Sequence, residues 1–145
     1  YTGSGLNRID YITMATAGNS TDFGDTIGAS TYYTNVGVTS NNTIGCFSGG
    51  YHETTTYTKV NIIQKITIQT PGNATDFGDM TQAGTSGSQC SDGTTGVIAP
   101  GEGATLDNRM DKITIGTPGN ATDFGDLVTN NTYLGGADGV SGAAS

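Results

Sequence analysis

The chain has 145 residues, of which 24 are Gly and 26 are Thr, and its formal net charge at pH 7 is −8. This length accommodates one domain, and a nucleic-acid-binding surface is excluded because it needs clustered Lys and Arg, whereas only five cationic residues are scattered here. No apolar run approaches about 18 residues, so we expect no membrane-spanning helix.

The same composition bears on whether the chain is ordered. Leu, Ile, Val and Phe together number only 25, which is few enough for disorder to be considered. Charged residues make up only 12%, however, and Thr, Ile and Val are plentiful, whereas disordered chains are highly charged and poor in β-branched residues. Because small and β-branched residues punctuated by Gly favour short strands and tight turns, we expect an all-β fold.

An internal repeat organises the chain. Three twenty-residue stretches align without a gap, and they read LNRIDYITMATAGNSTDFGD, VNIIQKITIQTPGNATDFGD and DNRMDKITIGTPGNATDFGD. They begin at residues 6, 60 and 107, so their spacings are 54 and 47 residues, close to those of propeller-blade repeats. The sequence therefore predicts one repeat domain over 1–145, with units at about 6–53, 60–106 and 107–145.

The first half of each stretch has the alternation of a half-buried strand. In each unit one pair of apolar residues is expected to point to the core, and Thr with Tyr or Lys to the opposite face. These inward pairs are Ile12 and Met14, Ile66 and Ile68, and Ile113 and Ile115.

A turn and an aromatic anchor follow in each stretch. Turns are predicted at 17–19, 71–73 and 118–120, and Pro followed by Gly in the last two suits a type II turn whose Gly takes a positive φ. Three phenylalanines are expected to anchor the units in the core, and three aspartates to accept backbone N–H groups in a tight turn. The phenylalanines are Phe23, Phe77 and Phe124, and the aspartates are Asp22, Asp76 and Asp123.

Beyond the repeated stretches, residues 44–50 predict a short apolar strand closed by two Gly, and residues 96–101 predict its counterpart. The third unit reaches Ser145 without a strand of this kind, and no such strand precedes the first stretch, so two complete units and a split third are expected. Cys46 and Cys90 could form a disulfide or remain as two small buried thiols, and the sequence leaves both open.

The first unit is seven residues longer than the second. Insertions in repeat proteins map to loops and often to the binding face, and exposed Tyr suits contacts with sugars or protein surfaces. Packing of these rings between units is the alternative. The candidate binding residues in the lengthened segments are Tyr32, Tyr33, Tyr51, His52 and Tyr57.

Catalysis is not expected. His52 is the only His and lies in a Thr-rich segment, so the sequence gives no basis for a Ser-His-Asp or Cys-His arrangement. A glycosidase needs one pair of carboxylates in unequal environments rather than the same pair three times. Those carboxylates could instead ligate calcium, but their D-x-x-D spacing differs from known calcium loops, so structural turns are favoured and no cofactor is expected. The pairs are Asp22 and Asp25, Asp76 and Asp79, and Asp123 and Asp126.

The repeated stretches, with the GN(S/A)TDFGD signature, resemble the kelch-like repeats of predicted structural and tail-fibre proteins of bacteriophages, especially cyanophages. The resemblance covers nearly the whole chain and is specific in the twenty-residue stretches. Family members usually carry an Arg-rich strand containing Cys-Ser before a double Gly; Ser88–Ser91 keeps part of it, and Pro100-Gly101 replaces the Gly pair.

The resemblance implies a β-propeller of four-stranded blades, which typically needs at least four blades to close. Three units would leave an incomplete ring, completed by oligomerisation or by a longer chain, and a β-solenoid or fibre is the alternative. The first residue is Tyr1 and no signal-peptide pattern is present, so we expect a processed product or a piece of something longer.

On function, the resemblance implies a non-catalytic protein of the virion surface, in an extracellular setting, such as a tail fibre, spike or decoration. Its expected partners are copies of itself, other virion proteins, or a glycan or protein on the host surface. A purely architectural filament or shell subunit is the first alternative. An extracellular glycan-active enzyme is the second.

Overall fold

The computed structural model describes residues 7–27, 36–53, 57–103 and 108–129. Over these residues the secondary structure consists of strands with no helix, so the all-β prediction is confirmed for this part of the chain. The strands are β1 (Arg8–Tyr11), β2 (Thr21–Asp25), β3 (Gly37–Ser40), β4 (Ile44–Ser48), β5 (Tyr51–Glu53), β6 (Tyr57–Lys59), β7 (Ile62–Thr67), β8 (Thr75–Asp79), β9 (Gly84–Ser91), β10 (Thr95–Gly103), β11 (Arg109–Thr114) and β12 (Thr122–Asp126).

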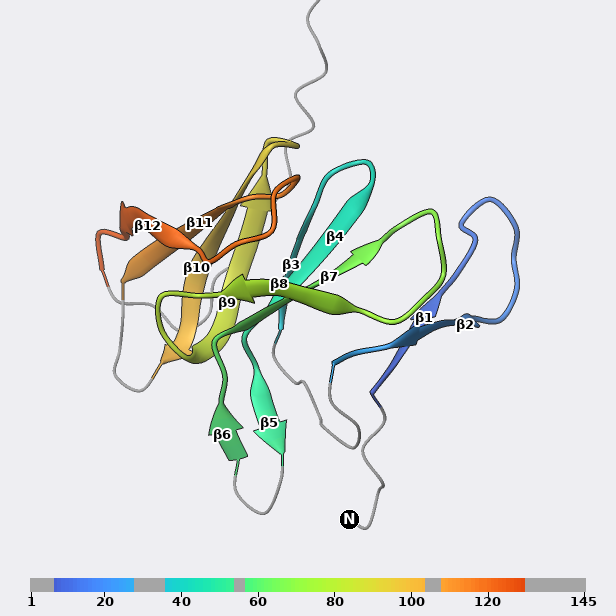
Figure 1. Cartoon of the computed structure of the whole chain (residues 1–145), viewed down its shortest axis with the longest axis horizontal. Helices are drawn as coiled ribbons and strands as arrows, with labels where there is room; N and C mark the ends of the chain where they lie inside the picture. The colour runs from blue at the N-terminus through green and yellow to red at the C-terminus, as the bar shows by residue number, and fades with distance from the viewer. Residues whose placement is uncertain (1–6, 28–35, 54–56, 104–107, 130–145) are drawn as a thin grey trace, which may run out of the picture.

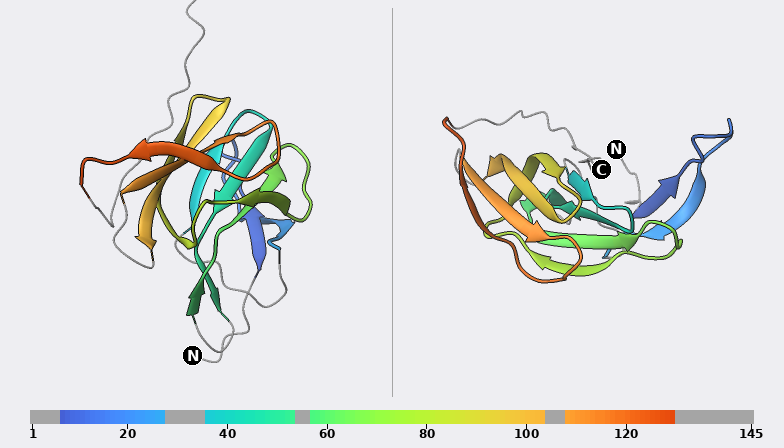
Figure 2. Two further views of the ribbon diagram at one scale, coloured as in Figure 1. Left: turned by 60° about the vertical axis from the view of Figure 1, so that its left-hand side comes forward. Right: turned by 90° about the horizontal axis from the view of Figure 1, so that it is seen from above.

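The strands form three successive antiparallel sheets and one separate hairpin. The first sheet is β1-β2, the middle sheet is β3-β4-β7-β8, and the last sheet is β9-β10-β11-β12. The sheets follow one another across the molecule, and the hairpin β5-β6 projects from the middle sheet (Figures 1 and 2). Each four-stranded sheet therefore joins the later strands of one sequence unit to the opening strands of the next, so sheet and unit boundaries differ.

Equivalent hydrogen bonds show that the two four-stranded sheets are built alike. Between β3 and β4 the Asn41 side chain accepts two backbone N–H groups at 2.8 and 2.7 Å. Between β9 and β10 the Asp92 carboxylate accepts two N–H groups at the same distances. The backbone oxygens of three asparagines, Asn7, Asn61 and Asn108, likewise each accept an N–H just beyond β2, β8 and β12 at 2.6 to 2.7 Å.

The TDFGD segments are strands with a bulge, so the tight turn expected there is wrong. β2, β8 and β12 pair with β1, β7 and β11, and the register shifts once in each pair. The central Gly takes φ values of 147°, 147° and 139°, which L residues rarely adopt. Within the bulge, the Asp22 carboxylate accepts the Gly24 N–H at 3.1 Å and Asp123 accepts the Gly125 N–H at 3.2 Å.

The predicted turns lie slightly earlier in the chain than expected. A backbone hydrogen bond closes each of them, from Thr16 to Thr13, from Thr70 to Thr67 and from Thr117 to Thr114, at 2.9 to 3.1 Å. Gly72 and Gly119 follow these turns and lack positive φ, so the type II geometry predicted at 71–73 and 118–120 is wrong. A type II turn needs positive φ at that Gly.

The core lies between the middle and last sheets. Ile113 and Ile115 are 4% and 0% exposed and belong to one cluster with Cys46 and Phe77 of the middle sheet. The corresponding side chains of the other units are not equally buried, so the inward pairs predicted for them are wrong in whole or in part. Ile66 is half-buried, Ile68 is exposed, and Ile12 and Met14 are 64% and 95% exposed.

The difference in burial among the three units has a simple cause. The isoleucine face of the last sheet packs against the complete sheet that precedes it, whereas in the described part of the chain the middle sheet is preceded by two strands. Among the described residues, no sheet precedes β1-β2. Side chains that would fill a complete interface in the middle of the array are therefore exposed at its start.

Consecutive sheets meet at two junctions that share one pair of hydrogen bonds. In the first junction the Asp25 C=O accepts the Ala74 N–H at 2.7 Å, and the Asn73 side chain accepts the Asp25 N–H at 3.0 Å. In the second junction Asp79, Ala121 and Asn120 take these places at 2.8 and 3.1 Å. The last residue of β2 or β8 is thus bonded, through its N–H and its C=O, to the loop before the following sheet's last strand.

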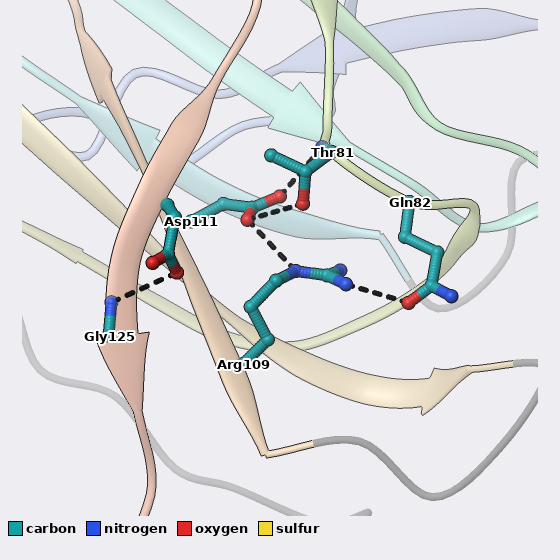
Figure 3. A network of polar contacts seen from close by, with 6 residues as sticks. Thr81, Gln82, Arg109, Asp111 and Gly125 are labelled. Carbon is teal, nitrogen blue, oxygen red and sulfur yellow. Dashed lines mark hydrogen bonds and ion pairs between the residues drawn. The ribbon is translucent and has the colours of Figure 1, made fainter.

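Each junction holds a further polar contact deeper in the sheets. The Gln64 side chain, which is buried in β7, accepts the Ile27 N–H at 2.7 Å. At the equivalent place in β11 the buried Asp111 carboxylate accepts the N–H and the hydroxyl of Thr81, at 2.9 and 2.7 Å, and pairs with Arg109 at 3.0 Å (Figure 3). Arg109 also donates to Gln82 at 2.6 Å, so this cluster links the middle and last sheets.

Candidate recognition surface

The hairpin β5-β6 is the main difference between the two four-stranded sheets. In the last sheet β10 is followed by β11, whereas in the middle sheet β4 is followed by this hairpin before β7 (Figure 1). Backbone hydrogen bonds at its base hold it against the start of β9. Gly50 donates to Gly84 at 3.0 Å, Val60 donates to Gly50 at 3.1 Å, and Gly84 donates to Val60 at 3.1 Å. The added residues thus project from a fixed base.

Three of the five predicted binding residues lie on this hairpin. Tyr51 and His52 are in β5, and Tyr57 is in β6. The register pairs Tyr51 with Lys59 and Glu53 with Tyr57, and the Lys59 ammonium lies 5.9 Å from the centroid of the half-buried Tyr51 ring, within the range of a cation–π interaction. Tyr32 and Tyr33 lie outside the described residues.

The predicted structural phenylalanines do not have equivalent surroundings. Phe23 and Phe77 are 7% and 3% exposed, whereas Phe124 is 51% exposed. Phe23 also meets the Tyr11 ring edge to face at 6.0 Å. Each buried Phe is covered by a following sheet, and Phe124 belongs to the last sheet that the structure describes, so the prediction of a core anchor is wrong for Phe124.

The repeated carboxylates are distributed over three separate strands. Asp22 and Asp123 bond within their own bulges, whereas Asp25 and Asp79 contribute backbone groups to the junctions. Among the described residues there is no group of three or more His, Cys, Asp or Glu side chains that could hold a metal ion. Asp76 in β8 corresponds to Asp22 and Asp123, and Asp126 in β12 corresponds to Asp25 and Asp79.

Two equivalent depressions lie beside the loops that form the junctions, with volumes of about 500 and 240 Å³. Each is open to solvent and is lined by one Lys, several Thr, and the Pro-Gly-Asn of the repeat. The shared lining positions are Lys65 and Lys112, Thr67 and Thr114, Thr70 and Thr117, Pro71 and Pro118, and Asn73 and Asn120. Hydroxyl and amide groups of this kind offer hydrogen bonds without a strong charge.

The two cysteines are free thiols, so the open choice between a disulfide and two thiols is answered in favour of thiols. Cys46 is buried in the core and Cys90 is partly buried. Burial raises the pKa of the Cys46 thiol from 9.0 to about 11, against a smaller opposing effect of Lys65. The Cys46 thiol is therefore protonated at neutral pH and has the character of a core side chain.

The hydrogen bonds of the junction residues were not predicted from the sequence. Asn73 and Asn120 were expected within turns, and no role was predicted for Gln64 or Asp111. The recurrence of Gly-Asn at 18–19, 72–73 and 119–120 was the available signal. Because Asn side chains readily hydrogen-bond to backbone groups, an Asn that recurs beside Gly in every unit indicates such a contact.

No described helix meets the length and hydropathy needed to cross a membrane. Comparison of the sequence with protein-family models and with curated proteins finds no match.

Proposed function

We propose that this chain is a non-catalytic structural protein of a virion surface, a tail fibre, spike or decoration, which uses its β-sheet array to display the β5-β6 hairpin. The observation that carries the proposal is the contrast between constant and variable parts. The two junctions repeat the same hydrogen bonds at Asp25 and Asp79, whereas among the described residues the hairpin occurs between β4 and β7 only. A constant scaffold with one added projecting element is typical of a repeat protein whose insertions bind.

The sheet topology supports the kelch-like propeller as the architecture of this array. The middle and last sheets are each four-stranded and antiparallel, with neighbouring strands in the order of a blade. The first sheet corresponds to the final two strands of such a blade, because β1 and β2 match β7 with β8 and β11 with β12 in register. The described sheets would then be two blades and half of a third.

The proposed mechanism is multivalent attachment to a glycan or protein on a host surface. Tyr offers a rigid ring with a polar tip at small entropic cost, and the hairpin brings Tyr51 and Tyr57 onto one short element with Lys59. A single hairpin of this size offers few contacts. Repetition over several chains of an assembly would raise the avidity without a strong individual site.

To test this, the protein is coupled to fluorescent beads. Binding of the beads is then measured on cyanobacterial cells and on a panel of bacterial surface polysaccharides. One variant replaces residues 53–59 with the shorter Ala-Thr-Leu sequence of 104–106. A second replaces Tyr32, Tyr33 and Tyr57 with Ala. Both should lose attachment while their circular dichroism and unfolding midpoints remain close to those of the unaltered protein.

Thr94→Ala provides the matched control, since it changes an exposed side chain in the turn between β9 and β10, at the end of the last sheet away from the hairpin. This variant should attach like the unaltered protein. Attachment that survives in the shortened-hairpin variant, or that the unaltered beads never show on any of these surfaces, would contradict the proposed role.

A further inference from the structure

We infer that the chain associates head to tail with a second copy of itself, through a third junction of the kind that it forms twice internally. One side, the socket, is the exposed end of the last sheet at Phe124, Gly125, Asp126 and Val128. The other side, the tip, is formed by Asp10 and the β1-β2 loop at Gly18, Asn19 and Ser20 of the next copy. The inference goes beyond the proposed function and holds whatever the hairpin binds.

The two internal junctions define what a socket must offer. The last residue of the TDFGD strand, Asp25 or Asp79, presents its N–H and C=O to the next unit. The residue two places further on, Ile27 or Thr81, presents its N–H as well. The bulge Gly must lie against the next unit's backbone, since a Cβ on Gly24 or Gly78 would collide with the carbonyl of Gly72 or Gly119.

The last sheet has all of these features, and among the residues that the structure describes no further unit covers it. Asp126 pairs with Arg109 in the same register as Asp79 with Ile62, so its N–H and C=O point outward from β12. A Cβ on Gly125 would meet no atom within 4 Å, although its φ of 139° matches that of the junction glycines. Phe124 is half-exposed and Val128 is fully exposed. The described residues form no third junction on this socket.

The start of the chain carries the complementary parts. Asn19 corresponds to Asn73 and Asn120, whose side chains accept the socket N–H. Asp10 corresponds to Gln64 and Asp111, and its pair with Arg8 repeats that of Asp111 with Arg109. The Asp111 side chain is 3% exposed within its junction, whereas the Asp10 side chain is 34% exposed.

Apolar side chains show the same complementarity. The tip end of the array exposes Ile12 and Met14, and the socket end exposes Phe124 and Val128. In the middle of the array the residues equivalent to these, Ile113, Ile115 and Phe77, are buried together in one cluster. Association of the two ends would bury the exposed apolar side chains as the internal junctions do.

Two substitutions weaken the tip relative to the internal loops. Ser20 stands where Ala74 and Ala121 are buried, and Ala17 stands where Pro71 and Pro118 fix the backbone. A buried hydroxyl has to be desolvated, and a Pro lowers the entropy lost on ordering the loop. The association between copies is therefore weaker than the internal contacts and reversible.

The two sides of this contact are different surfaces, so the interface is heterologous. Such contacts form a closed ring if the rotation between copies closes, and an open filament if it does not. In either case each chain contributes one tip and one socket. An isologous dimer, in which one surface meets itself, is excluded by this arrangement.

The experiment is sedimentation velocity of the full chain over a range of micromolar concentrations, with the fold of each variant checked by circular dichroism. The unaltered protein should sediment as larger species as concentration rises. Gly125→Ala and Phe124→Gln alter the socket, and Asn19→Ala alters the tip at an exposed side chain. Each should weaken association about tenfold or more, because a buried donor or acceptor or a close backbone contact is lost.

A mixture distinguishes head-to-tail association from any other kind. The Gly125→Ala chain keeps its tip and the Asn19→Ala chain keeps its socket, so their equimolar mixture should form a 1:1 dimer and no larger species. Ser20→Ala should tighten association relative to the unaltered chain. The inference is overturned if the unaltered chain stays monomeric throughout, if the socket variants associate as it does, or if the mixture forms no dimer.

Discussion

The side-chain oxygen of Asn120 accepts a hydrogen bond from the backbone N–H of Asp79 at 3.1 Å across 41 residues of sequence. Asn73 makes the same contact with Asp25 at 3.0 Å. In both cases the Asn follows a Gly of the repeat, and the bonded Asp ends the preceding TDFGD strand. The signature that identifies each unit is thus also the set of residues by which one unit binds the next.

Removing either Asn should destabilise the array. Asn73→Ala or Asn120→Ala leaves a strand-end N–H without its acceptor, which should lower the free energy of unfolding by about 1–2 kcal/mol each. Asn19→Ala is the matched control, because Asn19 is exposed and forms no internal junction among the described residues. Urea unfolding at low protein concentration measures all three. Equal effects at the three positions would contradict the assignment.

The bulge glycines should differ in their tolerance of a methyl group. Gly78→Ala combines a φ of 147° with a collision against the Gly119 carbonyl, so this variant should lose several kcal/mol or fail to fold. Gly125→Ala has the backbone strain alone and should lose about 1–2 kcal/mol in the isolated chain. Thermal unfolding provides the comparison, and a Gly78→Ala protein as stable as Gly125→Ala would disprove the close backbone contact.

The buried carboxylate of Asp111 should be replaceable only by another acceptor. Asp111→Ala leaves the Thr81 N–H without an acceptor and removes the partner of Arg109, so the free energy of unfolding should fall by about 3 kcal/mol. Asp111→Gln imitates Gln64, which serves the first junction without a charge, and should retain most of the stability. Chemical unfolding of both variants checks this. If Gln is as damaging as Ala, the acceptor is not what the junction needs.

Stability should fall at alkaline pH because of Cys46. The folded state keeps the thiol protonated up to a pKa of about 11, while the unfolded thiol ionises near 9.0. The unfolded state therefore binds fewer protons between these values, and stability is complete below pH 9 and decreases as pH rises toward 11, by about 2–3 kcal/mol. Cys46→Val copies Val97, its equivalent in the last sheet.

In this variant the contribution of the thiol is absent. The difference in unfolding free energy between the unaltered protein and Cys46→Val should thus change by that amount from pH 8.5 to 11. A difference that stays constant over the range would show that the Cys46 thiol is not buried as described.

Much of the local structure could be predicted from the sequence. Alternation and β-branched residues predicted a strand in the first half of each repeated stretch, where β1, β7 and β11 lie, and the double Gly at 49–50 closes β4 as expected. The strand character of TDFGD was missed because Asp and Gly disfavour strands. Here the Gly supplies a bulge with positive φ, and its partner strand supplies the pairing, so tertiary contacts override propensity.

What the sequence could not reveal was the position of each unit in the array. Phe77 and Phe124 lie in identical TDFGD segments, yet one is buried and the other half-exposed. Ile115 and Met14 differ in the same way on the opposite face. Sequence patterns describe what a unit can bury, whereas actual burial depends on whether a neighbour is present, which is a property of the array and not of the unit.

The most direct test of the junctions is amide hydrogen exchange resolved by residue, in dilute protein where copies do not meet. Exchange should be slow at Asp25, Ala74, Asp79 and Ala121, whose N–H groups donate across the two junctions, and fast at the equivalent Ser20 and Asp126. If Asp25 and Asp79 exchange as fast as Asp126, the sheets are not joined through their TDFGD strands, and the account of this protein as a stacked array is contradicted.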